Sequence, residues 1–231
     1  MRMKNKNIYI LAILAMLIAG YGYISSCTHK DSIISSSGPA IKRGTQILQY
    51  PSNTKVSFDK QHSNVGWETA YLGELSLLTG RFDTMGFTAF NFDEANPANI
   101  NFEAWVWVNK VNTSEPARDT GCLQTTFGTT NDMTTEAANV AIVKSNSVEF
   151  STTDNGYIVK FDFTFHGVTN ELTGKLFYDG MNVTGSGPTA KNNFGFSFNF
   201  QFQAISDYGI VSTSIADAVT VKCNAIFHQT Q

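Results

Sequence analysis

Alternation of apolar and polar side chains is the most regular feature of this sequence. Between Asn193 and Gln203 every second residue is phenylalanine, and the residues between them are Asn, Gly, Ser or Gln. Side chains of a β-strand point alternately to its two faces, whereas a helix would spread the rings around its circumference. The stretch therefore predicts a strand with one polar and one aromatic face. Such a face must be buried against a second sheet, inside a barrel, or around an apolar ligand.

The same alternation recurs along the rest of the chain. Apolar residues share one parity in the segments 100–108, 148–150, 157–165, 172–178 and 218–227. Asp154-Asn155-Gly156 is a hairpin-turn signal, and Asp179-Gly180 is a second candidate turn. The pattern at residues 134–143 is instead helix-like. Short alternating segments separated by turns predict an all-β sandwich or barrel.

The first 26 residues are expected to be a signal peptide. A basic segment, residues 2–6, precedes an apolar run over residues 8–20, which is the order of a secretory signal. The alternative is a retained membrane anchor, but the run is shorter than the roughly 20 residues that a transmembrane helix needs. Ser25-Ser26-Cys27 resembles the end of a bacterial lipoprotein signal, whose cysteine is acylated. Cys27 is therefore predicted to carry a lipid anchor.

Composition sets the organisation of the remaining chain. Residues 27–51 are rich in serine and lack an apolar period, which predicts a flexible tether. Residues 52–231 are predicted to form one β-domain. Without the three basic residues of the leader, 13 basic groups face 19 acidic groups. A mildly acidic chain argues against a nucleic-acid partner, which requires a basic face.

Several motifs of the predicted domain, taken in order, resemble the YceI family. The segment 58–67, FDKQHSNVGW, is similar to that family's opening Asp-x-x-His-Ser-x-x-x-aromatic strand. Residues 163–169, FTFHGVT, are similar to its Leu-Thr-Ile-(Arg/His)-Gly-Val-Thr signature. Weaker matches follow the same order, at Gly80-Arg81-Phe82, Val111-Asn112-Thr113, Arg118-Asp119, Phe194-Gly195-Phe196 and Ser206-Asp207-Tyr208-Gly209-Ile210. The ordered set covers about residues 56–227.

This resemblance implies a lipocalin-like antiparallel β-barrel of about eight strands, with a short helix or irregular segment at its mouth. It also implies an elongated apolar interior that holds a long isoprenoid or fatty chain, without catalysis and without a cofactor. The residues expected to line this interior are Trp67, Phe82, Phe102, Val106, Val108, Phe150, Phe161, Phe163, Phe165, Phe194, Phe196, Phe198 and Phe200.

Four polar residues are candidate contacts for a ligand headgroup. Arg81 and Arg118 have the side chain that binds phosphate or carboxylate in a bidentate manner, although a surface ion pair is the alternative. His62 and His166 lie in strongly patterned segments and can instead have a structural role. No HxH or CxxC spacing is present, so we expect no metal site. A nucleophile elbow and a phosphate-binding glycine loop are also absent from the sequence.

Two cysteines and two tryptophans lead to further expectations. Cys122 and Cys223 form an even pair in a chain predicted to be exported to an oxidising compartment, which suggests a disulfide. Trp105 and Trp107 have the parity opposite to Val106. Their rings are expected to lie under the tether or the helical segment, or to form a contact between two copies of the chain.

The sequence thus predicts a non-enzymatic lipid-binding lipoprotein of a bacterial cell envelope, anchored on the periplasmic side or at the outer membrane. Its expected partners are a long-chain lipid such as an isoprenoid quinone or polyprenyl compound, the membrane, and in one interpretation a second copy of the chain. One alternative is an unliganded interaction domain with an exposed Trp surface. Two others are a lipid-modifying enzyme and a transmembrane barrel.

Overall fold

The computed structural model describes residues 46–51, 55–127 and 139–230. The predicted signal peptide, Cys27 and most of the predicted tether lie outside these residues. So does the first half of the predicted helix, residues 134–138. Among the helices of the described ranges, none has the length and hydropathy required to cross a bilayer.

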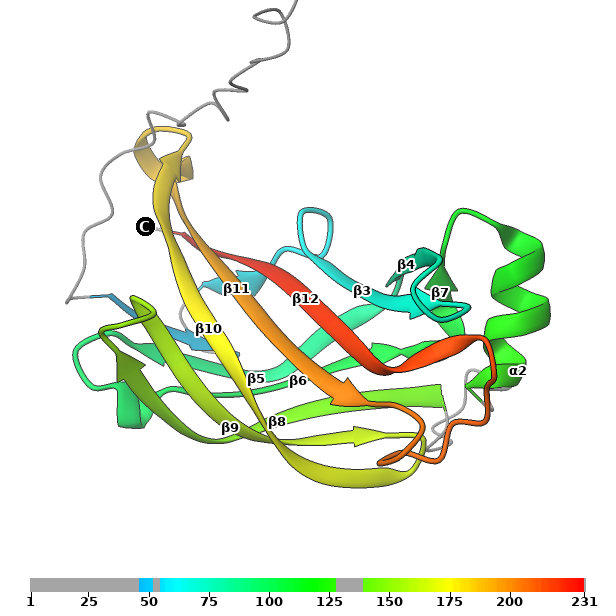
Figure 1. Ribbon diagram of the computed structural model, residues 1–231. Helices are drawn as coiled ribbons and strands as arrows, with labels where there is room; N and C mark the ends of the chain where they lie inside the picture. Colours follow the sequence, from blue (N-terminus) through cyan, green and yellow to red (C-terminus); the bar gives the residue numbers. More distant parts are fainter. Residues whose placement is uncertain (1–45, 52–54, 128–138, 231) are drawn as a thin grey trace, which may run out of the picture. The chain divides into compact units, whose positions relative to one another are not determined.

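The domain is built almost entirely from β-strands (Figure 1). The long strands are β3 (Asn64–Tyr71), β4 (Ser76–Phe82), β5 (Met85–Asp93), β6 (Asn101–Trp107), β8 (Val140–Ser151), β9 (Gly156–Phe165), β10 (Val168–Thr184), β11 (Lys191–Gln203) and β12 (Ile215–Thr230). Short strands are β1 (Ile47–Tyr50), β2 (Val56–Phe58) and β7 (Val111–Asn112). Helical turns are η2 (Pro97–Asn99), η3 (Val108–Lys110), η4 (Arg118–Leu123), α2 (Gln124–Thr126) and η6 (Gly187–Thr189).

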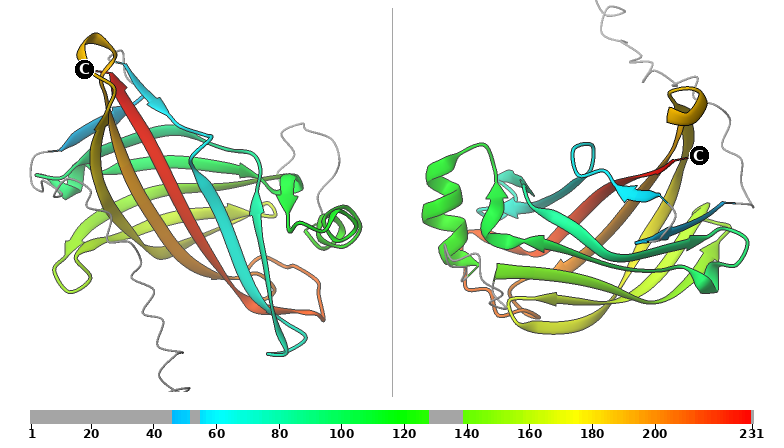
Figure 2. Two further views of the ribbon diagram at one scale, coloured as in Figure 1. Left: turned by 90° about the horizontal axis from the view of Figure 1, so that it is seen from above. Right: turned by 180° about the vertical axis from the view of Figure 1, so that it is seen from behind.

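All pairings in the sheet are antiparallel, and the strand order is β1-β5-β6-β8-β9-β10-β11-β12-β3-β4-β7, with β2 added on β12. The sheet curls strongly, so that β10, β11 and β12 cross over β5 and β6 (Figures 1 and 2). The predicted all-β antiparallel barrel is therefore confirmed, although the described residues form twelve strands where about eight were expected.

Short strands bring the two ends of this sheet together. β7 follows β6 directly through η3 and pairs with β4, so the β4 end of the strand order lies next to β6, near the opposite end. Elsewhere β1 pairs with β5 and β2 pairs with β12. The ring centroids of Tyr50 on β1 and Phe227 on β12 lie 5.7 Å apart, so the edge strand β1 also contacts β12 across the interior.

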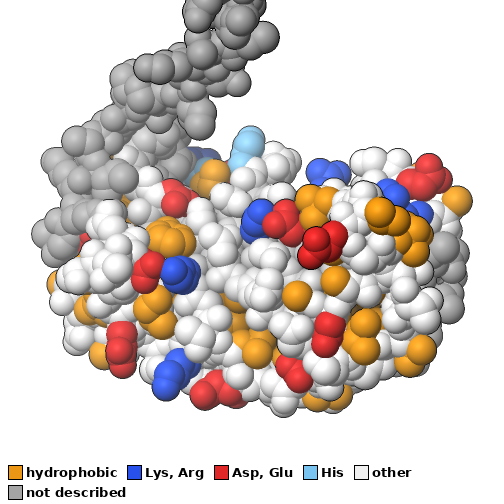
Figure 3. All heavy atoms as spheres, in the orientation of Figure 1, with side chains coloured by type: hydrophobic (Ala, Val, Ile, Leu, Met, Phe, Trp, Pro, Cys, Tyr) orange, Lys and Arg blue, Asp and Glu red, His pale blue; other side chains and the backbone are white. Residues whose placement is uncertain are grey.

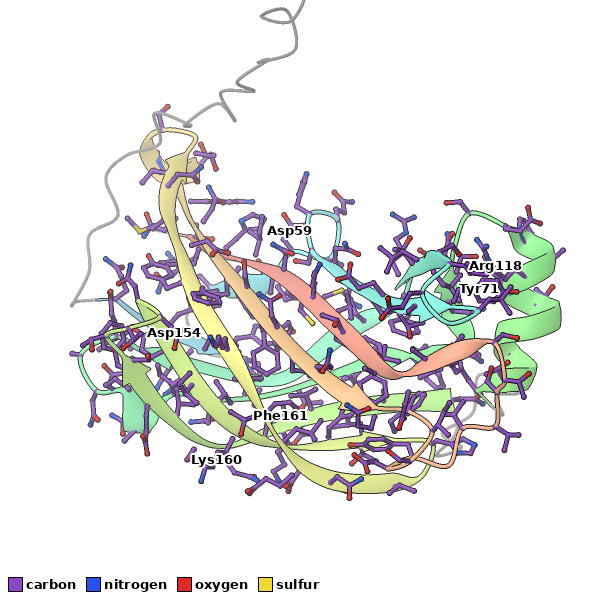
Figure 4. The ribbon with its side chains drawn as sticks, in the orientation of Figure 1. Asp59, Tyr71, Arg118, Asp154, Lys160 and Phe161 are labelled. Carbon is purple, nitrogen blue, oxygen red and sulfur yellow. The ribbon has the colours of Figure 1, made fainter. Side chains whose placement is uncertain are left out.

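The alternating pattern decides which face of each strand is buried. On β11 the five phenylalanines are each at most 8% exposed, and the intervening polar residues face outward. The same rule separates neighbours on β9, where Phe161 points into the domain and Lys160 points away from it (Figure 4). Inside, the rings contact one another edge to face, as for Phe163 and Phe202 at 4.9 Å. Each such pair adds about 0.5–1.5 kcal/mol beyond area burial.

Three local predictions are corrected by the structure. Residues 47–50, expected in the tether, form β1 because Leu48 is buried in the core and the backbone pairs with β5. Residues 140–143, expected in a helix, begin β8, where the run Val-Ala-Ile-Val pairs with β6. Gly180 is not in a turn, because β10 continues through it with a bulge at φ 123°.

Candidate functional site

An apolar cavity of about 110 Å³ lies inside the curled sheet. On the same measure one water molecule needs about 10–15 Å³, so the space is not a packing defect of atomic size. Along β11 its wall contains Phe196, Phe198, Phe200 and Phe202. These rings span six residue steps of about 3.4 Å, so this side of the wall is roughly 20 Å long. The cavity is therefore elongated, as a chain-like ligand requires.

The structure places nine of the thirteen predicted lining residues on this wall. They come from strands far apart in sequence, and β11 supplies the largest group. The nine are Trp67, Phe82, Phe102, Val106, Phe163, Phe165, Phe196, Phe198 and Phe200.

The other four predicted lining residues lie elsewhere. Phe161 and Phe194 are fully buried behind the wall, and the Phe161 ring packs edge to face on Phe198 and Phe200. Val108 is buried in η3, where the chain leaves the alternation of β6. Phe150 is 43% exposed because it lies at the end of β8, beyond the core. Parity identified an inward face, but the cavity occupies only part of that face.

Sequence reasoning missed several wall residues. Phe202 shares the parity of the other β11 rings, so the alternating pattern does contain the signal for it. Phe87, Phe90 and Phe127 also reach the wall, although no clear alternation marked them. Small residues, Ala104, Ala141, Ala204 and Ala225, leave the space that the rings enclose. Only the packing of the strands shows which small residues create a void.

Cys223 contributes a thiol to the wall and is a free cysteine. Burial raises the pKa of this thiol to about 12. The predicted bond between Cys122 and Cys223 is therefore not formed in the structure. Cys223 shares the inward parity of Val221 and Ala225 on β12, whereas Cys122 belongs to η4 and its side chain lies outside the described residues. An even number of cysteines does not show whether the two side chains point toward each other.

Arg81 lies beside the cavity but not in it. With Lys60, Gln61, Asn64 and Asp83 it lines a polar surface depression of about 420 Å³. Phe82 and Met85 belong to both the cavity and the depression, so the two adjoin. The Arg81 guanidinium contacts Asp83 at 3.1 Å and is largely exposed.

On the face shown in Figure 3, charged side chains of both signs are interspersed.

The remaining polar candidates make local contacts outside the cavity wall. Arg118 donates hydrogen bonds to the hydroxyl and the carbonyl of Thr113. The Nδ1 atom of His166 lies 3.1 Å from the carbonyl oxygen of Tyr208, and His166 and Gly167 form the turn between β9 and β10 with φ of 51° and 76°. The Nδ1 atom of His62 lies 2.7 Å from Asp59. Two of the sequence motifs thus have structural roles at turns.

Trp105 and Trp107 are half-buried in β6. Their rings pack edge to face with centroids 6.3 Å apart. The Trp105 indole covers Gly86, its cross-strand partner on β5, because no side chain occupies that position. The rings therefore pack on each other and on the sheet, and the expected contact with a second chain stays a prediction.

Comparison with known proteins agrees with this geometry. The model of the YceI-like domain matches residues 57–227. The chain belongs to the YceI-like family. No curated protein sequence matches it. Within this YceI-like domain, the Asp59 loop, the His166-Gly167 turn and the β11 rings are the structural counterparts of the sequence motifs.

Two solved structures with TM-scores above 0.5 show the same fold at low sequence identity. A YceI protein of Campylobacter jejuni has a TM-score of 0.54 and 19% identity over 68% of this chain and 88% of its own. BcnA of Burkholderia cenocepacia has a TM-score of 0.53 and 15% identity over 74% of this chain and 99% of its own. A polyisoprenoid binding domain of Saccharophagus degradans has a TM-score of 0.47 and 17% identity over 77% and 99%.

Proposed function

We propose that this YceI-like domain binds one long apolar lipid chain, such as an isoprenoid, in the Phe-lined cavity. The observation that supports this proposal is the elongated cavity, whose described wall residues include none that is charged. Each buried methylene of a ligand contributes about 0.8 kcal/mol of transfer free energy. Ordering the flexible chain offsets part of this gain.

Binding requires the rings of the wall to move. A cavity of about 110 Å³ is smaller than the roughly 300–1,000 Å³ of typical ligand sites. Phenylalanine rings rotate about two side-chain bonds, and the rings of β11 face open space on one side. A slim chain would therefore enter by displacing rings along the roughly 20 Å wall. The expected role is carriage, storage or protection of the lipid, without catalysis.

We also propose that the protein works at a bacterial cell envelope. The basic and apolar leader and the Cys27 motif support export followed by acylation. Cys27→Ser would then move the protein from the membrane to the soluble fraction. An unchanged membrane fraction would contradict the acyl anchor.

The test of lipid binding is native mass spectrometry of the full chain purified from cells in mild detergent. We expect a stoichiometric hydrophobic adduct, which solvent extraction would release for identification. Phe198→Asp places a carboxylate on the wall and should abolish the adduct. The matched control is Asn199→Asp on the outer face, where Lys175 and Lys222 are the cross-strand neighbours.

A second variant covers the case in which Phe198→Asp does not fold. Ala225 is 7% exposed and lines the cavity, so the larger side chain of Ala225→Leu would fill part of the cavity. This variant should weaken binding without introducing a charge. A chain that stays without adduct after incubation with isoprenoid quinones and polyprenyl phosphates would refute the proposal. An adduct of equal occupancy in folded Ala225→Leu would place binding elsewhere.

A further inference from the structure

Trp67 carries an unused hydrogen-bond donor in the cavity wall. The residue is 6% exposed, and its Nε1–H has no hydrogen-bond partner among the described residues. Leaving a buried donor unpaired destabilises the folded protein, because the group loses its hydrogen bond to water and gains none. Native proteins pair most such groups, so this exception requires an explanation.

Packing alone holds the Trp67 indole in place. Gly80 is its cross-strand partner, and a Cβ at Gly80 would lie 2.6 Å from Cζ2 and 2.7 Å from Cε2 of the indole. The ring of Phe127 packs on the indole edge to face at 6.3 Å. Phenylalanine or tyrosine could also cover Gly80 with a ring, but of these three large aromatic residues only tryptophan adds an N–H group.

Two other polar side chains of the wall already have hydrogen-bond partners, and the half-buried Trp105 is a second indole that lines the cavity. The hydroxyl of Thr69 donates to the carbonyl oxygen of Ala218 at 2.9 Å. Asn224 is exposed, and its amide lies 3.4 Å from the hydroxyl of Ser197 on the outer face. Among the residues that the structure describes, no Lys, Arg, His, Asp or Glu lines the cavity. A phosphate or carboxylate buried there would lack a counter-charge, and an unpaired buried charge is far more costly than an unpaired polar group.

We propose that Trp67 Nε1–H donates a hydrogen bond to an oxygen of the bound lipid. The ligand is then an uncharged long-chain lipid with an acceptor oxygen of the ketone, ester or quinone type. This inference rests on the proposed function and narrows it, because charged polyprenyl phosphates and free fatty acids are disfavoured inside the cavity. Trp67 then favours a lipid with an acceptor oxygen over a pure hydrocarbon of the same shape.

The experiment compares three isoprenoid probes that differ at the head: geranylgeranylacetone, a ketone; geranylgeranyl phosphate; and phytane, a hydrocarbon. Dissociation constants are measured by titration of the delipidated full chain. Trp67→Phe removes the donor and keeps a ring over Gly80. Trp107→Phe is the matched control, because Trp107 is half-buried in β6 and does not line the cavity.

We expect Trp67→Phe to weaken ketone binding by about 2- to 13-fold, the equivalent of one ordinary hydrogen bond, and to leave phytane binding unchanged. Wild-type protein should bind the ketone more tightly than the phosphate. The ketone, but not phytane, should shift the indole N–H resonance of Trp67 downfield, a change that loss of packing would not produce. If Trp67→Phe misfolds, 3-benzothienylalanine at position 67 replaces the N–H with sulfur at nearly constant shape.

Two kinds of failure are distinguishable. Equal effects of Trp67→Phe on ketone and phytane, or no effect on either, would overturn the role of the donor while lipid binding stands. Tighter binding of the phosphate than of the ketone would overturn the neutral-lipid assignment. No binding of any probe to wild-type protein would refute the proposed function itself, and the inference with it.

Discussion

Asp59 and His228 lie 169 residues apart in sequence, and the Oδ2 and Nε2 atoms of their side chains are 2.7 Å apart. The second ring nitrogen of His228 lies 2.6 Å from Asn193 on β11. Asp59 also accepts the N–H groups of Gln61 and His62, and Figure 4 shows it in the loop before β3. One carboxylate therefore fastens the start of the domain to its last strand.

This contact predicts acid sensitivity. Burial acts to raise the pKa of Asp59, but hydrogen bonds from His62, His228 and the backbone outweigh it and lower the pKa from 3.8 to about 2. A carboxyl with a depressed native pKa adds stability above its unfolded pKa and loses it as pH falls through the native value. Stability should thus fall between about pH 4 and pH 2.

Asp59→Asn should lower the free energy of unfolding at neutral pH by about 1–3 kcal/mol, because hydrogen bonds to a charged group are lost. The variant should also lose less unfolding free energy than wild type between about pH 4 and pH 2, as measured by urea denaturation from pH 7 to pH 2. Asp83→Asn is the control, because the Arg81–Asp83 pair is exposed and such pairs contribute about 0–1 kcal/mol. An identical loss of stability at acid pH in wild type and Asp59→Asn would contradict the role of Asp59 in acid sensitivity.

Two glycines that face tryptophans should respond differently to alanine. A Cβ at Gly80 meets the Trp67 ring at 2.6 Å, and one at Gly86 meets the Trp105 ring at 2.7 Å. Trp67 is enclosed, so Gly80→Ala should destabilise by about 1–3 kcal/mol through overpacking. Trp105 is half-buried and can move outward, so Gly86→Ala should cost less. Thermal unfolding measures the stability loss of each variant. Equal losses would show that the indole of Trp67 can move away from position 80.

Tyr208 connects the loop after β11 to β9. It is fully buried, and its hydroxyl donates to the carbonyl oxygen of Phe163 at 3.3 Å. Tyr208→Phe should cost about 0.5–1.5 kcal/mol of unfolding free energy. Tyr71→Phe, at the exposed end of β3, should cost almost nothing. A larger loss for Tyr71→Phe than for Tyr208→Phe would contradict this.

Alkaline pH tests the same residue. Burial first, and the nearby Asp207 charge second, raise the pKa of Tyr208 to about 12, despite a hydrogen bond from Asn170. A raised native pKa adds stability below the unfolded value of about 10 and loses it as pH approaches about 12. Wild-type protein should therefore lose more stability over this range than Tyr208→Phe. If the unfolding free energies of the two proteins change equally above about pH 10, the raised pKa of Tyr208 is contradicted.

Cys223 should react very slowly while the domain is folded. Its pKa is raised by burial from 9.0 to about 12, and the thiolate is the reactive form. At pH 8 the thiolate fraction then falls about a thousandfold relative to an exposed cysteine. Peptide mapping after iodoacetamide treatment, in buffer and in urea, measures the difference. A similar rate of modification in both would show that the thiol is accessible.

Sequence reasoning succeeded wherever local geometry decides the outcome. Alternation over residues 193–203 and 157–165 predicted β11 and β9, because successive side chains on any strand face opposite ways whatever its partners are. The turn at Asp154-Asn155-Gly156 joins β8 and β9 as predicted, with Asn155 at φ 51°. The turn signal failed at Asp179-Gly180, where β10 continues through a bulge.

By itself, then, the sequence determined an all-β domain, its aromatic inner face and its family resemblance, since these depend on strand periodicity and on motif order. Only the tertiary structure decided that Phe161 fills the core while Phe198 borders open space, and that the Trp67 donor has no partner among the described residues. It also decided that Leu48 belongs to the core. Such outcomes depend on which strands meet across the interior, and those strands are brought together over long sequence separations that no local pattern encodes.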